Sequence, residues 1–189
     1  MSKTPVLLLT DIGADIDDTE ALFVLAGAQE HFVLVGCVTS VNDGVARGTL
    51  LRGWLRKLRM DENDEIPIFP SIDCATASCI VPPEFLACAK SIGRVQDTPS
   101  HILELVRLYG SSLVVICIAP LTAFANAVKL CPDSFRTVKR IYIQGNVFMN
   151  AMGRLEPDER AYNFRVDMDA ARTVLTYLHV QKYEVQNVH

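Results

Sequence analysis

The sequence lacks the features that mark several large classes of protein. No apolar run approaches the length that a membrane-spanning helix needs. The short apolar run near the N-terminus leads directly into a group of aspartates, which is not the pattern of a secretory signal. Basic residues are in the minority, 18 lysines and arginines against 22 aspartates and glutamates, so the charge gives no footprint for nucleic acid. We therefore expect a cytoplasmic protein whose partners include neither a membrane nor a nucleic acid.

The six cysteines form no C-x-x-C pair, which is the local signature of many zinc and redox sites. Cys37 and Cys117 lie in apolar runs with the character of strands, where a free thiol behaves as a small hydrophobic side chain. We therefore expect reduced cysteines, with neither disulfides nor zinc as the framework of the fold.

Half of the 189 residues are apolar, too many for a disordered chain and enough for one domain with a sizeable core. Short apolar runs, which predict buried strands, alternate with segments of helical periodicity. We predict strands at 6–9, 32–38, 66–69, 113–118 and 138–143, and helices at 19–25, 45–58, 98–109, 121–130 and 169–178. In the second helix, arginines fall on the face opposite the apolar and small residues. Residues 70–97 are the least regular segment, a long loop with one short helix near 84–91. This alternation predicts an α/β fold, a mostly parallel central sheet flanked by helices with a Rossmann-like core.

The first predicted strand is followed by a loop with four aspartates in eight residues, Asp11, Asp15, Asp17 and Asp18. Carboxylates this close repel one another, and removing them from water costs free energy. A strand, an acidic loop and a helix is the layout of a ligand site at the carboxyl end of a sheet strand. The pattern favours a hard divalent cation, and calcium takes more oxygen ligands in looser geometry than magnesium.

Two other interpretations of this loop stay open. The first is a solvated turn whose aspartates cap the next helix and charge its first turn, a role that fits one or two aspartates better than four. The second is a haloacid-dehalogenase-type phosphatase, because residues 15–19 match its D-x-D-x-T string. The nucleophile of that family directly ends its strand, whereas Asp15 follows the predicted strand end at Asp11 by four residues.

The loop also resembles the N-terminal signature of the nucleoside hydrolase family. That signature is an apolar strand, a D-x-D-P-G-x-D-D-like loop and a helix that begins A-L. Residues 10–18, TDIGADIDD, are similar to it with two additional loop residues. Thr10 stands in place of the family's first Asp, and Ile12 in place of its Pro.

Two later stretches resemble the family in the same order along the chain. The segment IAPLT is similar to the family's G-P-L-T-N motif, in which the Thr gives a backbone carbonyl to calcium, and Thr122 matches that Thr. The segment IYIQGN is similar to a strand that ends in M-G-G, and it puts Gln144 in place of a Met near the sugar. Gly145, which follows, permits close approach of the backbone to a ligand.

Two further stretches resemble the sugar-binding parts of the family. The segment AYNFRVDMDAA is similar to A-E-F-N-x-x-x-D-P-E-A-A, and Asn163 matches the Asn that binds ribose. Asp167 matches the following Asp, and we expect it to be a carboxylate at a helix start. The segment TSVNDG resembles the turn T-T-V-x-G-N, where Asn42 or Asp43 substitutes for the family's Asn. Asn-Asp-Gly is also a strong turn string without a ligand.

The resemblance implies a calcium-dependent N-ribosyl hydrolase that cleaves a nucleoside to ribose and free base. Such cleavage passes through a sugar with oxocarbenium character, and a carboxylate beside the attacking water can take its proton. The implied general base, which takes the proton of the attacking water, is Asp11. The implied calcium ligands are Asp11, Asp18 and the carbonyl of Thr122, and the implied substrate-binding residues are Asp17, Asn42, Gln144 and Asn163.

The sequence departs from the family at several positions. Nucleoside hydrolases are usually longer, and a last calcium-binding Asp and a neighbouring His lie in their C-terminal part. No H-D or W-D pair occurs here, and Ala123 and Ala161 replace polar residues of the family's motifs. We expect a single domain over 1–189 that is truncated at the C-terminus relative to the family. An alternative function is a catalytically impaired relative that binds metal, ribose or a protein partner, and the phosphatase is a second alternative. Apolar surface left by the missing part predicts a homo-oligomer.

Overall fold

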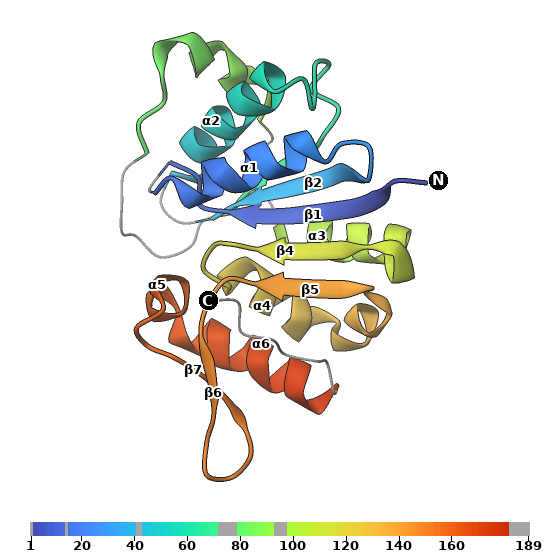
Figure 1. Cartoon of the computed structure of the whole chain (residues 1–189), viewed down its shortest axis with the longest axis vertical. Helices are drawn as coiled ribbons and strands as arrows, with labels where there is room; N and C mark the ends of the chain where they lie inside the picture. The colour runs from blue at the N-terminus through green and yellow to red at the C-terminus, as the bar shows by residue number, and fades with distance from the viewer. Residues whose placement is uncertain (1, 14, 41–42, 72–78, 93–97, 182–189) are drawn as a thin grey trace.

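The centre of the molecule is a parallel sheet of five strands. The computed structural model describes residues 2–13, 15–40, 43–71, 79–92 and 98–181. The sheet order is β3-β2-β1-β4-β5, and every neighbouring pair runs parallel (Figure 1). The strands are β1 (Thr4–Thr10), β2 (Phe32–Thr39), β3 (Ile68–Pro70), β4 (Val114–Cys117) and β5 (Arg140–Ile143). The sequence prediction of a mostly parallel α/β sheet is confirmed.

Helices lie on both faces of this sheet. They are α1 (Asp17–Gly27), α2 (Gly44–Lys57), α3 (Thr98–Tyr109), α4 (Thr122–Leu130), α5 (Tyr162–Val166) and α6 (Met168–Val180). The described residues also form the short 3₁₀ helices η1 (Pro83–Ser91), η2 (Gly110–Ser112) and η3 (Pro132–Thr137). A small antiparallel hairpin, β6 (Val147–Met149) and β7 (Leu155–Pro157), follows β5. None of the helices in the described ranges is long and apolar enough to cross a bilayer.

Two hydrophobic cores form because successive side chains of a strand point to opposite faces. Leu7 and Leu9 of β1 pack in one core with buried residues of α3, α4 and α6. Val6 and Leu8 pack in the other core with buried residues of α1 and α2. All four side chains are completely buried. The apolar run of β1 therefore forms the middle layer of the domain, and it fixes where the acidic loop after it emerges.

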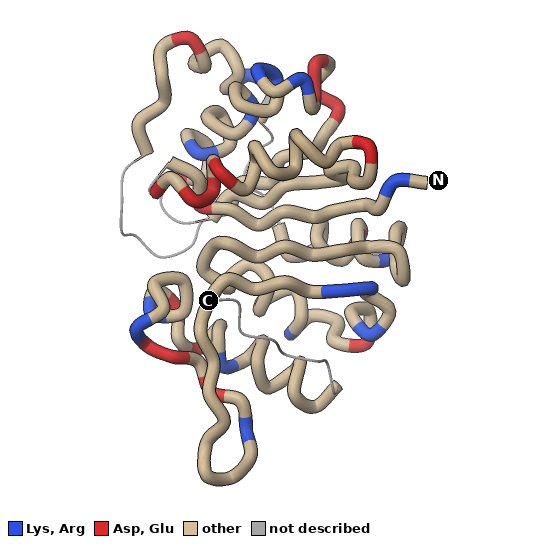
Figure 2. The backbone as a smooth tube through the Cα atoms, viewed as in Figure 1, with Lys and Arg blue, Asp and Glu red and all other residues tan. Residues whose placement is uncertain are grey.

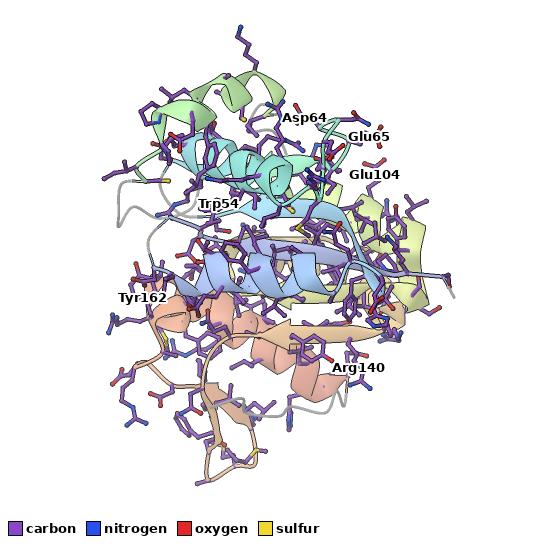
Figure 3. All side chains as sticks on the ribbon, turned by 45° about the horizontal axis from the view of Figure 1, so that its top comes forward. Trp54, Asp64, Glu65, Glu104, Arg140 and Tyr162 are labelled. Carbon is purple, nitrogen blue, oxygen red and sulfur yellow. The ribbon has the colours of Figure 1, made fainter. Side chains whose placement is uncertain are left out.

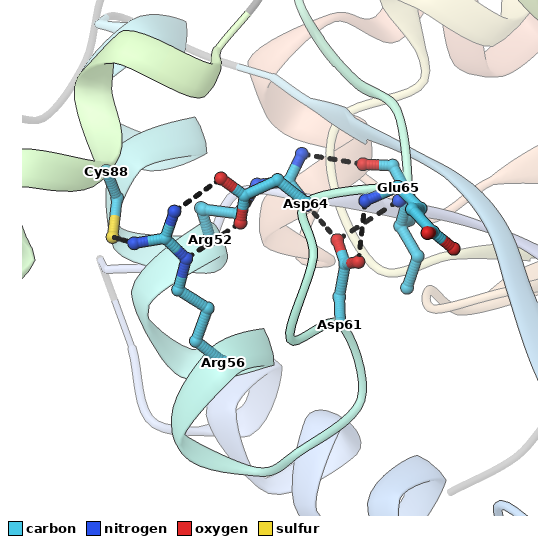
Figure 4. Close-up of polar contacts among 7 residues, drawn as sticks. Arg52, Arg56, Asp61, Asp64, Glu65 and Cys88 are labelled. Carbon is cyan, nitrogen blue, oxygen red and sulfur yellow. Dashed lines mark hydrogen bonds and ion pairs between the residues drawn. The ribbon is translucent and has the colours of Figure 1, made fainter.

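Helix α2 differs from the prediction, because Arg47 and Arg52 are buried rather than on an outer face. Arg47 contacts the loop after β1 and Arg52 contacts the segment between α2 and β3, so neither guanidinium faces solvent. The short helix η1 also packs closely against α2. A Cβ on Gly53 would lie 2.2 Å from the ring of Phe85 in η1. The guanidinium of Arg52 is compensated by an ion pair with Asp61 and by the carbonyl of Ile66 at 2.6 Å. Figure 4 shows this cluster, which includes the Arg56–Asp64 ion pair.

Other differences from the prediction are small or local. Helix α1 begins at Asp17, two residues before the predicted start, and β3 begins at Ile68 rather than 66. The hairpin and α5 were not predicted, because the segment between β5 and α6 is short and has no clear periodicity. Part of the predicted loop 70–97 lies outside the described residues, and its short helix is η1. The five cysteines in the described ranges are free thiols, and Cys74 lies outside them.

Candidate functional site

A cleft of about 170 Å³ opens at the edge of the sheet where β1, β4 and β5 end. Four segments meet there: the acidic loop after β1, the end of β4, the end of β5 and the start of α5. The residues that line the cleft are Asp11, Asp15, Asp17, Asp18, Ile118, Gln144, Gly145, Ala161, Tyr162 and Asn163. In Figure 3, Tyr162 lies at this end of the sheet and Arg140, at the start of β5, lies at the other. The structure therefore brings together Asp11, Asp17, Asp18, Gln144 and Asn163, all of which were selected from the sequence.

The four aspartates divide into two buried and two exposed carboxylates. Asp11 is 5% exposed and Asp18 is 3% exposed, whereas Asp15 and Asp17 face solvent. Burial raises the pKa of Asp11 to about 6, against the opposing effect of the nearby Arg47 charge. Burial also raises the pKa of Asp18 to about 7, although a hydrogen bond from Thr10 opposes this shift. A bound cation would offset the free-energy cost of ionising these two buried carboxylates.

Thr10 and Arg47 hold the loop in place, and neither was selected from the sequence. The hydroxyl of Thr10 donates to Oδ1 of Asp18 and accepts from the backbone N–H of Ile12 at 3.2 Å. The guanidinium of Arg47, fully buried in α2, donates to the carbonyl of Asp11 and to that of Ile12 at 2.8 Å. Nothing local to the loop predicts the contact with Arg47, which lies 36 residues from Asp11.

A chain of amide hydrogen bonds crosses the cleft from the acidic loop to α5. Nε2 of Gln144 donates to Oδ2 of Asp17 at 2.8 Å. Oε1 of Gln144 accepts from Nδ2 of Asn163 at 2.9 Å, and the same Nδ2 donates to the carbonyl of Ile118 at 3.1 Å. Both amide orientations follow from this network. Carboxylate and amide groups arranged in this way offer acceptors and donors to the hydroxyls of a sugar.

Two glycines, one in the acidic loop and one in the cleft wall, are required for different reasons. Gly13 has φ +99°, a conformation that favours glycine, and a Cβ there would lie 2.7 Å from Sγ of Cys79. Gly145 lines the cleft, and a Cβ there would lie 2.3 Å from the ring of Phe164. From the sequence, Gly145 was expected to permit close approach of the backbone to a ligand. The structure shows that the ring of Phe164, behind the cleft wall, requires this glycine.

Of the predicted residues that the structure describes, Thr122 does not join this group of side chains. Thr122 does not line the cleft, and its hydroxyl donates to Oδ2 of Asp167 at 2.6 Å. Asp167 caps α6, where its Oδ1 accepts from the N–H of Ala170 at 2.9 Å, as expected of a helix-start carboxylate. Asn42 lies outside the described residues. Its neighbour Asp43 caps α2, which agrees with the simple turn interpretation for that position.

The cleft fits a hard divalent cation in the chemistry of its donors. The acidic donors are all carboxylate oxygens, and the two that are buried have raised pKa values. Within the described ranges, no group of three or more His, Cys, Asp or Glu side chains is arranged to surround one ion. For such a cation, Asp11 and Asp18 would supply only part of a coordination shell, and the remaining ligands would have to come from carbonyl groups, water or substrate.

Known structures share this fold. A type III effector protein, XopQ, in complex with adenosine diphosphate ribose matches with a TM-score of 0.78 and 21% identity, covering 95% of this chain and 55% of that one. A plant nucleoside hydrolase matches with a TM-score of 0.64 and 20% identity, covering 93% and 57%. A purine-preferring ribonucleoside hydrolase from Gardnerella vaginalis matches with a TM-score of 0.62 and 20% identity, covering 90% and 57%. This chain thus spans little more than half the length of these proteins.

The likeness to solved structures shows the fold alone, because the identities are low. No curated protein matches the chain. The sequence model of the inosine-uridine preferring nucleoside hydrolases, however, matches residues 6–187, nearly the whole chain. The family's ordered motifs, the parallel sheet and the acidic cleft at its carboxyl edge agree with that match. The chain belongs to the inosine-uridine preferring nucleoside hydrolase family.

Proposed function

We propose that the cleft binds the ribose of a nucleoside and that the protein hydrolyses the N-glycosidic bond with the aid of calcium. One observation carries this proposal: two buried carboxylates and an amide chain face the same small cleft. The carboxylates of Asp11 and Asp18 suit a cation and a water molecule, and Asp17, Gln144 and Asn163 suit sugar hydroxyls. The XopQ complex with adenosine diphosphate ribose supports a ribosyl ligand for this fold.

Asp11 is the general base in this proposal. Without a bound cation the pKa of Asp11 is about 6, so Asp11 is mainly ionised at neutral pH, which is the form that takes a proton from water. Arg47 hydrogen-bonds to the backbone carbonyls of Asp11 and Ile12, so it positions Asp11 while the carboxylate oxygens stay available. Departure of the nucleobase leaves positive charge on the sugar, which the ionised carboxylates of the loop stabilise.

Asp17 and Asn163 bind the ribose hydroxyls, and Gln144 sets the distance between them. In the structure Gln144 bonds to both residues at once, so the two groups are already aligned before a sugar arrives. Asp11 and Asp18 hold calcium, with the carbonyl of Thr122 as a further proposed ligand. When bound there, calcium supplies the positive charge that offsets the buried carboxylates and orients the hydroxyls of the sugar. Asn42 is a further proposed contact to the sugar.

Release of free ribose from purine and pyrimidine nucleosides tests the proposal. We expect release that requires calcium, stops with a chelator, and falls to background in Asp18→Ala. The matched control is Asp169→Ala, because Asp169 is an exposed first-turn aspartate of α6 outside the cleft. No release from folded protein at saturating calcium would overturn hydrolysis, and equal loss in both variants would overturn the role of Asp18.

A second candidate function is ribosyl binding without hydrolysis. The incomplete carboxylate shell favours it, as does Ala161, which lines the cleft where the family signature has Glu. Calorimetry with ribose separates the two functions. Binding that depends on Asn163 but is accompanied by no turnover of any nucleoside supports the second candidate, and turnover rejects it.

A further inference from the structure

Two arginines lie beside the wall of the cleft opposite the acidic loop. Ala161, Tyr162 and Asn163 line the cleft, and an arginine flanks them on each side, Arg160 before and Arg165 after. Figure 2 shows the acidic loop before α1 and the basic positions beside α5 at the same end of the sheet. A neutral nucleoside gives these two arginines nothing to bind.

The two arginines are in different electrostatic states. Arg160 is committed to Asp158, with Nη2 2.6 Å from Oδ2 and Nε 3.0 Å from Oδ1. Arg165 is exposed, and no ion pair links it to any residue in the described ranges. Its charge is therefore available to a ligand, whereas the charge of Arg160 is already neutralised.

Arg165 is also placed by the cleft itself. Its guanidinium carbon lies 5.7 Å from the centre of the Tyr162 ring, a cation–π contact. The two residues are three apart in α5, so they lie on the same face of this short helix. Because Tyr162 lines the cleft, the planar donor group of Arg165 lies at its rim. An arginine presents paired N–H donors that match the oxygens of a phosphate.

We propose that the cleft takes a phosphorylated ribosyl compound, with the sugar on Asp17 and Asn163 and the phosphate on Arg165. This inference rests on the proposed function, since it uses the same ribose site. When no cation is bound, the four aspartates repel an anion from the cleft, so the phosphate binds only at the rim, and only when the ribose anchors it. Inorganic phosphate has no ribose to anchor it, so it does not gain this binding.

Calorimetry with ribose, ribose 5-phosphate and inorganic phosphate tests the inference, because none of the three can be hydrolysed at an N-glycosidic bond. At low salt we expect ribose 5-phosphate to bind about fivefold more tightly than ribose, the upper effect of one exposed ion pair. Arg165→Gln removes this preference and leaves the affinity for ribose unchanged. The matched control Arg172→Gln retains the preference, because Arg172 is an exposed arginine of α6 that pairs with Asp169. The preference also falls as salt rises.

The outcomes separate the inference from the proposed function. Ribose binding without a preference for the phosphorylated sugar, or a preference that survives Arg165→Gln, overturns the inference and leaves the ribose site intact. Inorganic phosphate that binds as tightly as ribose 5-phosphate also overturns it. If neither sugar binds with or without calcium, the ribose site fails and the inference fails with it. Loss of ribose 5-phosphate binding in Asn163→Ala supports a shared site.

Discussion

The guanidinium of Arg47 donates to the backbone carbonyl of Asp11 from a fully buried position in α2. The same Nη1 reaches the carbonyl of Ile12 at 2.8 Å, so one side chain fixes two consecutive peptides of the acidic loop. Its charge also opposes the effect of burial on the pKa of Asp11. This arginine therefore links the sheet-covering helix to the geometry of the cleft.

Replacement of Arg47 by Lys tests this link. A single ammonium cannot reproduce the donor arrangement, so we expect the loop to loosen and the affinity for ribose or calcium to fall about tenfold. We expect the free energy of unfolding to fall by about 1–3 kcal/mol. Calorimetry and denaturant titration measure the two effects separately.

The control for Arg47→Lys is Arg52→Lys. Arg52 is also buried in α2, but its partners Asp61 and Ile66 lie away from the cleft. It should lose comparable stability and keep its ligand affinity. Equal losses of affinity in the two variants would mean that Arg47 acts only through general stability.

Stability without calcium should depend on pH through Asp11 and Asp18. Both folded-state pKa values are raised, to about 6 and about 7, from the ordinary aspartate value of 3.8. The free energy of unfolding is then greatest below about pH 4, decreases as the pH rises through these folded pKa values, and stays constant above them. A shift of two pKa units in one carboxyl group corresponds to about 3 kcal/mol of stability lost between low and high pH. Thermal melts in chelator should show a lower melting temperature at pH 8 than at pH 5.

The variant and the metal provide independent checks of this pH dependence. Asp18→Asn should flatten the profile and raise the melting temperature at pH 8, because the carboxylate that is costly to ionise is gone. Calcium should stabilise the unmodified protein more at pH 8 than at pH 5, since it binds the ionised form. A melting temperature that rises with pH in chelator would contradict the assigned direction.

Gly145→Ala should destabilise the protein and distort the cleft. The added Cβ would lie 2.3 Å from the ring of Phe164, which is nearly fully buried and has little room to move. We expect a loss of about 1–3 kcal/mol, measured by denaturant titration. Gly27→Ala is the control, because a Cβ there meets nothing within 4 Å, and it should be neutral or slightly stabilising. Equal effects at the two positions would contradict the packing explanation.

We expect the protein to form a dimer or larger assembly through the β5 side of the molecule. Within the described part of the sheet, β5 pairs only with β4 and leaves an edge, which is a site for association. Exposed apolar side chains lie beside this edge and on the adjoining hairpin: Tyr142, Phe148, Met149 and Met152. Light scattering measures the state, and Phe148→Asp should shift it toward monomer. Leu108→Asp, at an exposed position in α3, should not. A clean monomer at high concentration would count against this surface.

The sequence alone determined the parts of this protein that depend on neighbouring residues. The alternation of apolar runs and helical segments predicted the parallel sheet, and the acidic loop was placed at the end of β1. The role of Asp167 as a helix cap was also predicted, because capping involves residues three positions apart. The order of motifs along the chain predicted the family.

Only the tertiary structure decided which distant side chains meet. Gln144 bonds to Asp17 across 127 residues of sequence, and Arg47 reaches the loop across 36. The local pattern of α2 suggested an exposed arginine face, because it carries no information about the loop after β1 and Asp61, which contact Arg47 and Arg52. Phe164 imposes glycine at position 145 for the same reason. Such contacts depend on how whole elements pack, and no local periodicity encodes them, so the chemistry of the cleft follows from the fold rather than from any single motif.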